Sequence, residues 1–246
     1  MCDVMLYVRR YCLYIILSGL LLVVSGCGQR TDAREAARHV AYKAQIAAVQ
    51  DAINSYKKKT GVLPIKNSTE STPVYRKYRI DFKKLEDYLP NPPSDAYEQG
   101  GDFEYVLVHP ETEPTVKVID MALVGAVQDL DQQIQNYYDH HQFAPIKGIM
   151  ANGRYSIDFK ALNYRKALTV ISPYSGRPLG LFLDENAKVE IDYLPDIYDT
   201  VKKSGKTYKT GMDLRILLVD KFPYVPINSV PYTMKNGKVD FLINNH

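Results

Sequence analysis

Two aspartates with the same neighbours are candidates for catalytic carboxylates. Asp81 and Asp158 each lie in the string Ile-Asp-Phe-Lys. A pair of carboxylates is the catalytic set of most glycosidases. An aspartate directly before a short helical segment is also an ordinary helix N-cap, and a repeated segment would explain why there are two. We therefore predict that both carboxylates cap helices and that neither is catalytic.

The histidines lack the spacing of a metal site. His140 and His141 are adjacent and follow Asp139, and adjacent residues of a helix point in different directions. The remaining histidines are isolated in the sequence: His39, His109 and His246. No His-x-His, His-Glu-x-x-His, Gly-x-Ser-x-Gly or Walker motif is present. We expect no catalytic residue, no metal and no cofactor, and hence a protein that is not an enzyme.

Cys27 has the setting that points most directly to a chemical modification. Arg9 and Arg10 precede an apolar run from Tyr11 to Val24, and small residues follow it up to the cysteine. A charged segment, a short apolar segment and small residues at a cleavage point are the layout of an export signal. The apolar run is shorter than the roughly 20 residues that a membrane-spanning helix needs.

The segment Val24-Ser25-Gly26-Cys27 resembles the lipobox of bacterial lipoproteins. The resemblance implies cleavage between Gly26 and Cys27, a diacylglycerol on the Cys27 thiol, and anchoring on the outer, extracytoplasmic face of the cell membrane. Two acyl chains give stable anchoring where one does not. The alternative is an ordinary short hydrophobic helix with an incidental cysteine. Either Met1 or Met5 could be the start.

Charge and cysteine content limit the classes open to the exported part. The chain has a net charge of +3, and the signal, with Asp3, Arg9 and Arg10, carries +1 of it, which leaves +2. This near-neutral balance does not support nucleic-acid binding. Cys2 and Cys12 lie in the signal, so the mature chain has no disulfide and must be stabilised by burial of a core.

An 81-residue offset organises the mature chain. Pro-Ile-Lys occurs at 64–66 and again at 145–147. Upstream of each copy runs an apolar stripe with helical spacing. The two stripes match residue by residue: Tyr42, Ile46, Val49, Ile53 and Tyr56, then Leu123, Val127, Leu130, Ile134 and Tyr137. A competing offset of 78, through Ala-Val-Gln-Asp at 48–51 and 126–129, needs a gap before the prolines.

The pattern predicts an α+β protein of two tandem modules, each with a long helix, a Pro-bearing loop, a short helix and an antiparallel β-hairpin. The strands are expected at 103–108 and 116–120 in the first module, and at 179–183 and 189–192 in the second. Asp32 and Glu35 resemble a capping box at the start of the first long helix. In a partial third unit, Asn236-Gly237 predicts a type I′ hairpin turn.

These patterns divide the chain into five parts. We expect a signal peptide at 1–26, the lipidated cysteine and a short tether at 27–32, the two modules at 33–120 and 121–195, and a linker with the partial third unit at 196–246. The linker is assigned to 196–211, where Lys, Ser and Gly cluster. Pro226-Ile227, another 81 residues beyond the second Pro-Ile, marks the third unit.

The loops after the two long helices are the expected place for ligand contacts, because binding residues concentrate in loops on rigid modules. Tyr75 and Tyr78 end the first loop, and Tyr155 ends the second. The two loops could present a shared tyrosine-lined surface. The alternative is that these tyrosines close the hydrophobic core beneath the loops.

The lipobox, the paired modules and the segment from Asp213-Leu214-Arg215 to Pro231-Tyr232 together resemble lipoproteins of Bacillus-type bacteria, the YphF-like group. Some members carry the label of ABC-transporter binding protein. The expected function is a membrane-anchored, non-enzymatic interaction or ligand-binding module with an envelope protein or cell-wall partner. The alternative is a solute-binding lipoprotein of an ABC-type transporter, which usually needs two α/β lobes and a cleft.

Overall fold

The computed structural model describes residues 29–242, with side chains from residue 42 onward. The signal segment, with Gly26 and Cys27, lies outside the described residues. The chain divides into two compact units, residues 1–47 and 48–246. The described part of the first unit is helical, and Asp32 lies within this helix rather than at its start. The predicted cap position at Asp32 is therefore wrong.

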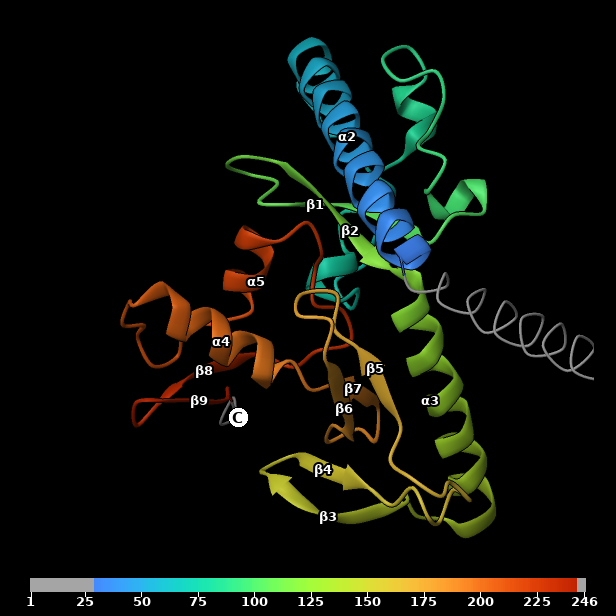
Figure 1. Cartoon of the computed structure of the whole chain (residues 1–246), viewed down its shortest axis with the longest axis vertical. Coiled ribbons are helices and arrows are strands. Elements are labelled where there is room, and N and C mark those ends of the chain that lie inside the picture. Colours follow the sequence, from blue (N-terminus) through green and yellow to red (C-terminus); the bar gives the residue numbers. More distant parts are fainter. Residues whose placement is uncertain (1–28, 243–246) are drawn as a thin grey trace, which may run out of the picture. The chain divides into compact units, whose positions relative to one another are not determined.

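The helices and strands follow one another in a mixed order along the chain (Figure 1). The α-helices are α2 (Gln29–Thr60), α3 (Met121–His141), α4 (Leu194–Ser204) and α5 (Ile216–Lys221). The strands are β1 (Phe103–Val108), β2 (Thr115–Asp120), β3 (Ile146–Ala151), β4 (Arg154–Ile157), β5 (Thr169–Ile171), β6 (Pro178–Leu183), β7 (Val189–Ile191), β8 (Tyr232–Lys235) and β9 (Lys238–Phe241). Short 3₁₀ helices span Val74–Arg76, Phe82–Leu85 and Tyr97–Gln99.

The strands pair antiparallel in three sheets within the described residues. Strands β1 and β2 form a hairpin, β8 and β9 form another, and the largest sheet has the order β3-β4-β6-β5 with β7 on β6. The hairpins predicted near 103–120, 179–192 and 231–243 are confirmed. The predicted type I′ turn is supported too, because Asn236 and Gly237 both have positive φ, 50° and 76°. The protein is therefore α+β.

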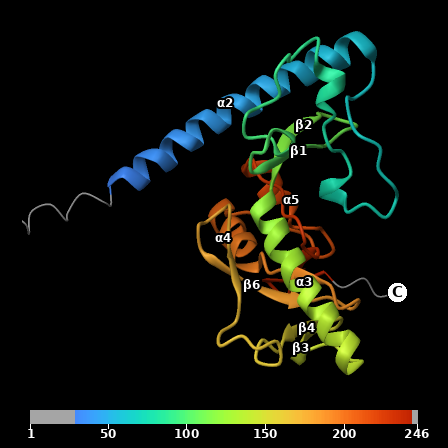
Figure 2. The same ribbon diagram turned by 90° about the vertical axis from the view of Figure 1, so that its right-hand side faces the viewer.

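Helix α3 buries the apolar stripe predicted from the sequence. Leu123, Val127, Leu130 and Ile134 are all buried, and α3 contacts β5 and β7. Figure 2 shows α3 running beside the sheet that contains β6. The carboxylate of Asp120 caps the helix by accepting the Ala122 N–H at 2.9 Å. The helix ends where Gln142 takes a left-handed backbone conformation.

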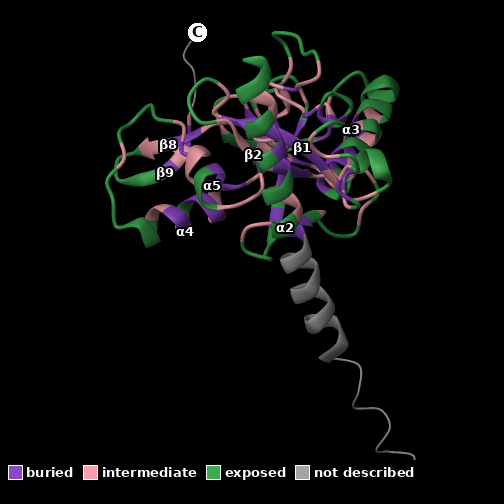
Figure 3. Ribbon diagram, turned by 90° about the horizontal axis from the view of Figure 1, so that it is seen from above, coloured by how far each residue is buried: buried purple, intermediate pink, exposed green. Residues whose placement is uncertain are grey.

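A continuous hydrophobic core extends through much of the second unit of the chain. Side chains from β1, β2, α3, the central sheet, α4, α5 and the final hairpin contribute to it. Figure 3 shows β1 and β2 among the buried residues, whereas the outer turns of α3 are exposed. The described residues 29–242 contain no cysteine, so this core must stabilise them without a disulfide.

Three parts of the predicted architecture differ from the structure. Residues 145–155, expected as a loop, form most of the β3–β4 hairpin. The expected linker at 196–211 begins inside α4, whose lysines stand in its last turn before Gly205 in a left-handed conformation. The segment after Asp158 is a turn and not a helix, although the matching segment after Asp81 is a 3₁₀ helix.

Candidate functional site: two helix–hairpin grooves

Gln50 ties helix α2 to the β1–β2 hairpin. Its side-chain Nε2 donates to the Pro114 carbonyl at 2.9 Å, and its Oε1 accepts the Val116 N–H at 2.8 Å. The side-chain amide thus satisfies one main-chain acceptor and one main-chain donor at the start of β2. Because Val116 is almost fully buried, its N–H would cost free energy if it had no acceptor.

Asp131 makes the corresponding contact between α3 and the β6–β7 hairpin, 81 residues later. Its Oδ1 accepts the N–H of Val189, the first residue of β7, at 2.8 Å. Burial raises the pKa of the Asp131 carboxyl, and the hydrogen bond from Val189 opposes this effect. Only an acceptor is used here, so a carboxylate can take the place of the amide of Gln50.

An open groove lies beside each of these contacts. The α2 groove, about 630 Å³, is lined by residues 112–115 of the hairpin turn and by Gln50, Asn54, Lys57 and Lys58. The α3 groove, about 600 Å³, is lined by residues 185–188 of the hairpin turn, by Ala144, and by a helix face with Gln128, Asp131, Gln132, Ile134, Gln135 and Tyr138. Both have the volume of a small-molecule site.

The groove positions also follow the 81-residue offset. Gln50 corresponds to Asp131, Asn54 to Gln135, and Lys57 to Tyr138. None of these helix positions is among the site residues predicted from the sequence. The offset locates them once it is extended from the apolar stripe to the polar positions of the same helices.

Asp81 caps a short 3₁₀ helix as predicted, whereas Asp158 precedes a turn, so the helix cap predicted at Asp158 is wrong. The Asp81 carboxylate accepts the Lys83 N–H at 3.3 Å, and the Asp158 carboxylate accepts the Lys160 N–H at 3.1 Å. The N–H of each aspartate in turn donates to the carbonyl of the proline of Pro-Ile-Lys, at 2.8 Å and 2.7 Å. Asp213 accepts the N–H two residues on in the same way, at 3.0 Å.

The tyrosines predicted to contact a ligand are each partly buried and belong to different elements. Tyr75 lies in a short 3₁₀ helix with the Arg215 guanidinium 5.3 Å from its ring centre, and burial raises its pKa to about 12. Tyr155 lies in β4. Tyr75 and Tyr155 both pack against the hydrophobic core. The carbonyl of Tyr78 accepts the Leu107 N–H at 2.8 Å. These contacts favour the alternative in which the tyrosines close the core.

The adjacent histidines cap the exposed end of α3. The Nδ1 atoms of His140 and His141 donate to the carbonyls of Asn136 and Tyr137 at 2.7 Å and 2.9 Å. Within residues 29–242, no group of three or more His, Cys, Asp or Glu side chains could hold a metal ion.

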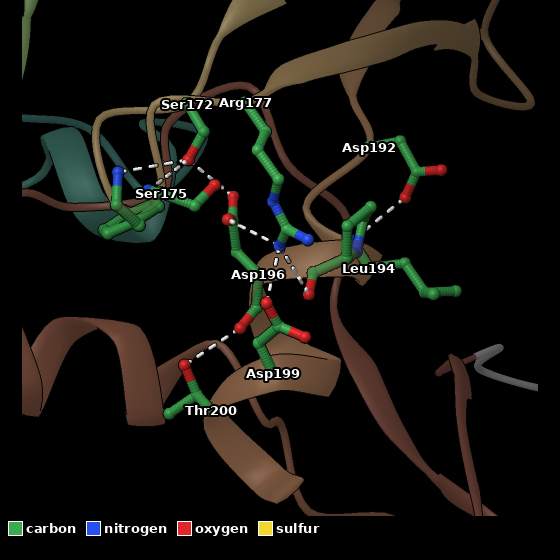
Figure 4. Close-up of polar contacts among 10 residues, drawn as sticks. Ser172, Ser175, Arg177, Asp192, Leu194, Asp196, Asp199 and Thr200 are labelled. Atoms are coloured by element: carbon green, nitrogen blue, oxygen red, sulfur yellow. Dashed lines mark hydrogen bonds and ion pairs between the residues drawn. The ribbon is translucent and has the colours of Figure 1, made fainter. Parts of the chain in front are cut away.

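A buried polar cluster at the start of α4 was not anticipated from the sequence. Ser172 donates its hydroxyl to Asp196 Oδ2 at 2.7 Å and accepts the N–H groups of Tyr174 and Ser175 (Figure 4). Arg177 covers the Asp196 carboxylate, with 3.9 Å between its nitrogen and Oδ1. A pocket of about 420 Å³ adjoins the cluster. The Pro195-Asp196 pair at a helix start was the available signal.

Residues 42–120 match the YphF family N-terminal domain. This match supports a YphF-like family for the segment that contains the α2 groove, and it ends at Asp120, the cap of α3. No curated protein and no solved structure matches the chain. No helix among residues 29–242 is both long and apolar enough to cross a membrane.

Proposed function

We propose that the protein is a lipoprotein held on the outer face of the cell membrane by Cys27, and that its exported part is a non-enzymatic ligand-binding module. The Val24-Ser25-Gly26-Cys27 segment and the charged, short apolar segment before it support the anchor. A partner in the cell envelope, either a protein or a wall polymer, is consistent with this location.

The paired grooves are the observation that carries the binding function. Each is open to solvent, has a volume near 600 Å³, and lies between a helix and a hairpin turn. Most of the residues that line them have polar side chains, with amides, carboxylates, hydroxyls and lysines that can hydrogen-bond a ligand. The engaged carboxylates of Asp81 and Asp158 argue for binding rather than catalysis.

A solute-binding protein of an ABC-type transporter is a weaker candidate. Such proteins usually have two lobes with parallel sheets and a ligand cleft between them. The sheets described here are antiparallel, and the larger grooves lie between a helix and a hairpin turn. These features favour an interaction module.

We also propose that residues 33–120 and 121–195 are homologous modules, and that 196–246 contains a third, partial unit. The matched contacts of Gln50 and Asp131 support the 81-residue offset. Asp81 and Asp158 also make matching contacts, but they are 77 residues apart, so the second copy is four residues shorter by this point. In the third unit, Asp213 accepts the N–H of Arg215, the same contact that Asp81 and Asp158 make. This contact supports the third unit better than the Pro226-Ile227 sequence does.

Substitution of Cys27 tests the anchor. In Cys27→Ser cells we expect the protein to leave the membrane fraction or to keep its signal peptide, because no thiol is available for lipid attachment. Fractionation and intact mass measure both effects. The matched control is Ser25→Ala, which keeps a small residue in the lipobox and should be processed normally. A Cys27→Ser protein that is equally membrane-bound and equal in mass would contradict the proposal.

A further inference from the structure

The α3 groove has a lining suited to a ligand rich in hydroxyl groups. Gln128, Gln132 and Gln135 lie at helical spacing on one face of α3, and Asn186 faces them from the hairpin turn. A side-chain amide offers two donor hydrogens and an acceptor oxygen. Gln132 and Gln135 each donate once to a neighbouring helix residue, which leaves their oxygens and a second hydrogen for a ligand.

The charges of the α3 groove argue against an anionic ligand. The groove lining contains two acidic residues, Asp131 and Glu185, and one basic residue, Lys188. A phosphate or a polyanion would meet net repulsion here. An uncharged ligand would accept hydrogen bonds from the amides and donate to the carboxylates without an ion partner.

Tyr138 supplies an exposed aromatic ring at the end of the groove. It follows Gln135 by three residues on the same helix face, and 45% of its surface is accessible. An aromatic ring with an accessible face can stack on the apolar C–H face of a pyranose, while the amides bind the hydroxyls at the ring edge. Amides, carboxylates and one open aromatic ring are together the chemistry that recognises a sugar.

The α2 groove shows that the fold does not require this lining. It keeps the helix–hairpin contact through Gln50, but Lys57 stands at the position of Tyr138, and Lys58 adds a second cation. The aromatic ring of Tyr138 is therefore a feature of the α3 groove alone and is not demanded by the contact with the hairpin.

We propose that the α3 groove binds a neutral oligosaccharide, with one sugar ring stacked on Tyr138 and its hydroxyl groups hydrogen-bonded by Gln128, Gln135 and Asn186. This assignment rests on the proposed ligand-binding function and names its substrate class. A peptide bound as an added strand fits less well, because the groove is walled by a helix and a hairpin turn and has no strand residue in its lining for main-chain pairing.

Isothermal titration of the full chain tests the assignment, in a detergent without a sugar headgroup. The probes are two neutral tetrasaccharides, cellotetraose and N-acetylchitotetraose, with tetraalanine as the peptide probe. We expect at least one tetrasaccharide to bind with a Kd of about 1 mM or tighter. Tyr138→Ala should weaken this binding about tenfold, as loss of an aromatic stacking partner does. Tyr138→Phe should retain most of it.

Tyr198→Ala is the matched control, because Tyr198 is a similarly exposed tyrosine (48%) that lines neither groove, and it should leave sugar binding unchanged. Because Tyr138 is exposed, its variants should keep the melting temperature of the original chain. The proposal is overturned if neither tetrasaccharide binds, if Tyr138→Ala binds as well as the original chain, or if tetraalanine alone binds. Binding of tetraalanine would leave the ligand-binding function standing, and failure of the lipid anchor is detected separately by fractionation of Cys27→Ser.

Discussion

Gln50 and Asp131 hold their hairpins by the same main-chain group, the N–H of a buried valine in the second strand. The oxygen-to-nitrogen distance is 2.8 Å in both contacts, to Val116 and to Val189. In each case a polar residue of a helix supplies the acceptor that the end of the hairpin lacks. In each helix–hairpin pair, one polar side chain therefore links the helix to the end of the hairpin.

The two contacts predict different losses of stability when the amide and the carboxylate are exchanged. Asp131→Asn keeps an oxygen acceptor for Val189 and should cost little stability. Gln50→Glu loses the donor to the Pro114 carbonyl and places a negative charge beside it, so it should destabilise by roughly 1–3 kcal/mol. Urea denaturation measures both, with Asn67→Asp, at an exposed position away from both contacts, as the control. Equal losses for the two exchanges would contradict this account.

Tyr75→Ser should lower the melting temperature. The ring of Tyr75 packs against the core and against the Arg215 guanidinium, so its removal should cost about 2–3 kcal/mol, or roughly 4–12 °C. Tyr97→Ser, at a position that is 56% exposed, is the control and should change the melting temperature little. A Tyr75→Ser protein with an unchanged melting temperature would instead favour the ligand-contact interpretation.

The elements that could be predicted from the sequence are those fixed by local pattern. The hairpins at 103–120 and 231–243 have β-rich segments bounded by turn residues, and the stripe of α3 has a helical period. Asp81 was recognised as a cap because a capping aspartate acts on the next few residues of its own segment. None of these features depends on distant parts of the chain.

The elements that could not be predicted depend on tertiary contacts or on ambiguous composition. Strand β3 contains Gly148 and several exposed residues, so it lacks the alternation of a half-buried strand; pairing with β4 determines its structure. Helix α4 ends in lysines that also suit a linker. The grooves arise only when Gln50 and Asp131 meet hairpins more than 50 residues away, a distance that no local pattern records.

Ser172→Ala should be strongly destabilising, because it leaves the buried Asp196 carboxylate without a hydroxyl donor. Oδ1 of this carboxylate has no hydrogen-bond partner, and Arg177 lies 3.9 Å away, so Ser172 supplies the hydrogen bond to the carboxylate. We expect a loss of roughly 2–4 kcal/mol in urea denaturation. The exposed Ser175 uses only its N–H in the cluster, so Ser175→Ala is a matched control. Similar losses for both alanine variants would refute the assignment.

Glu190 should make the protein less stable as pH rises toward neutrality. Burial, reinforced by the charge of Asp184, raises the pKa of Glu190 from 4.5 to about 7, while Arg215 opposes the change. Between these values the folded chain retains a proton that the unfolded chain releases, so the free energy of unfolding falls as pH rises through this window. The fall levels off above about pH 7 and amounts to at most roughly 3 kcal/mol.

Glu190→Gln removes this titration and leaves the other acids in place. Relative to the original chain, the variant should gain stability steadily from about pH 4.5 to 7, because a neutral amide carries no charge to desolvate. Urea midpoints at a series of pH values measure the difference. Glu185→Gln, whose side chain is 62% exposed, is the control and should show little pH-dependent difference. If the Glu190→Gln difference is the same at every pH, Glu190 does not titrate in this window.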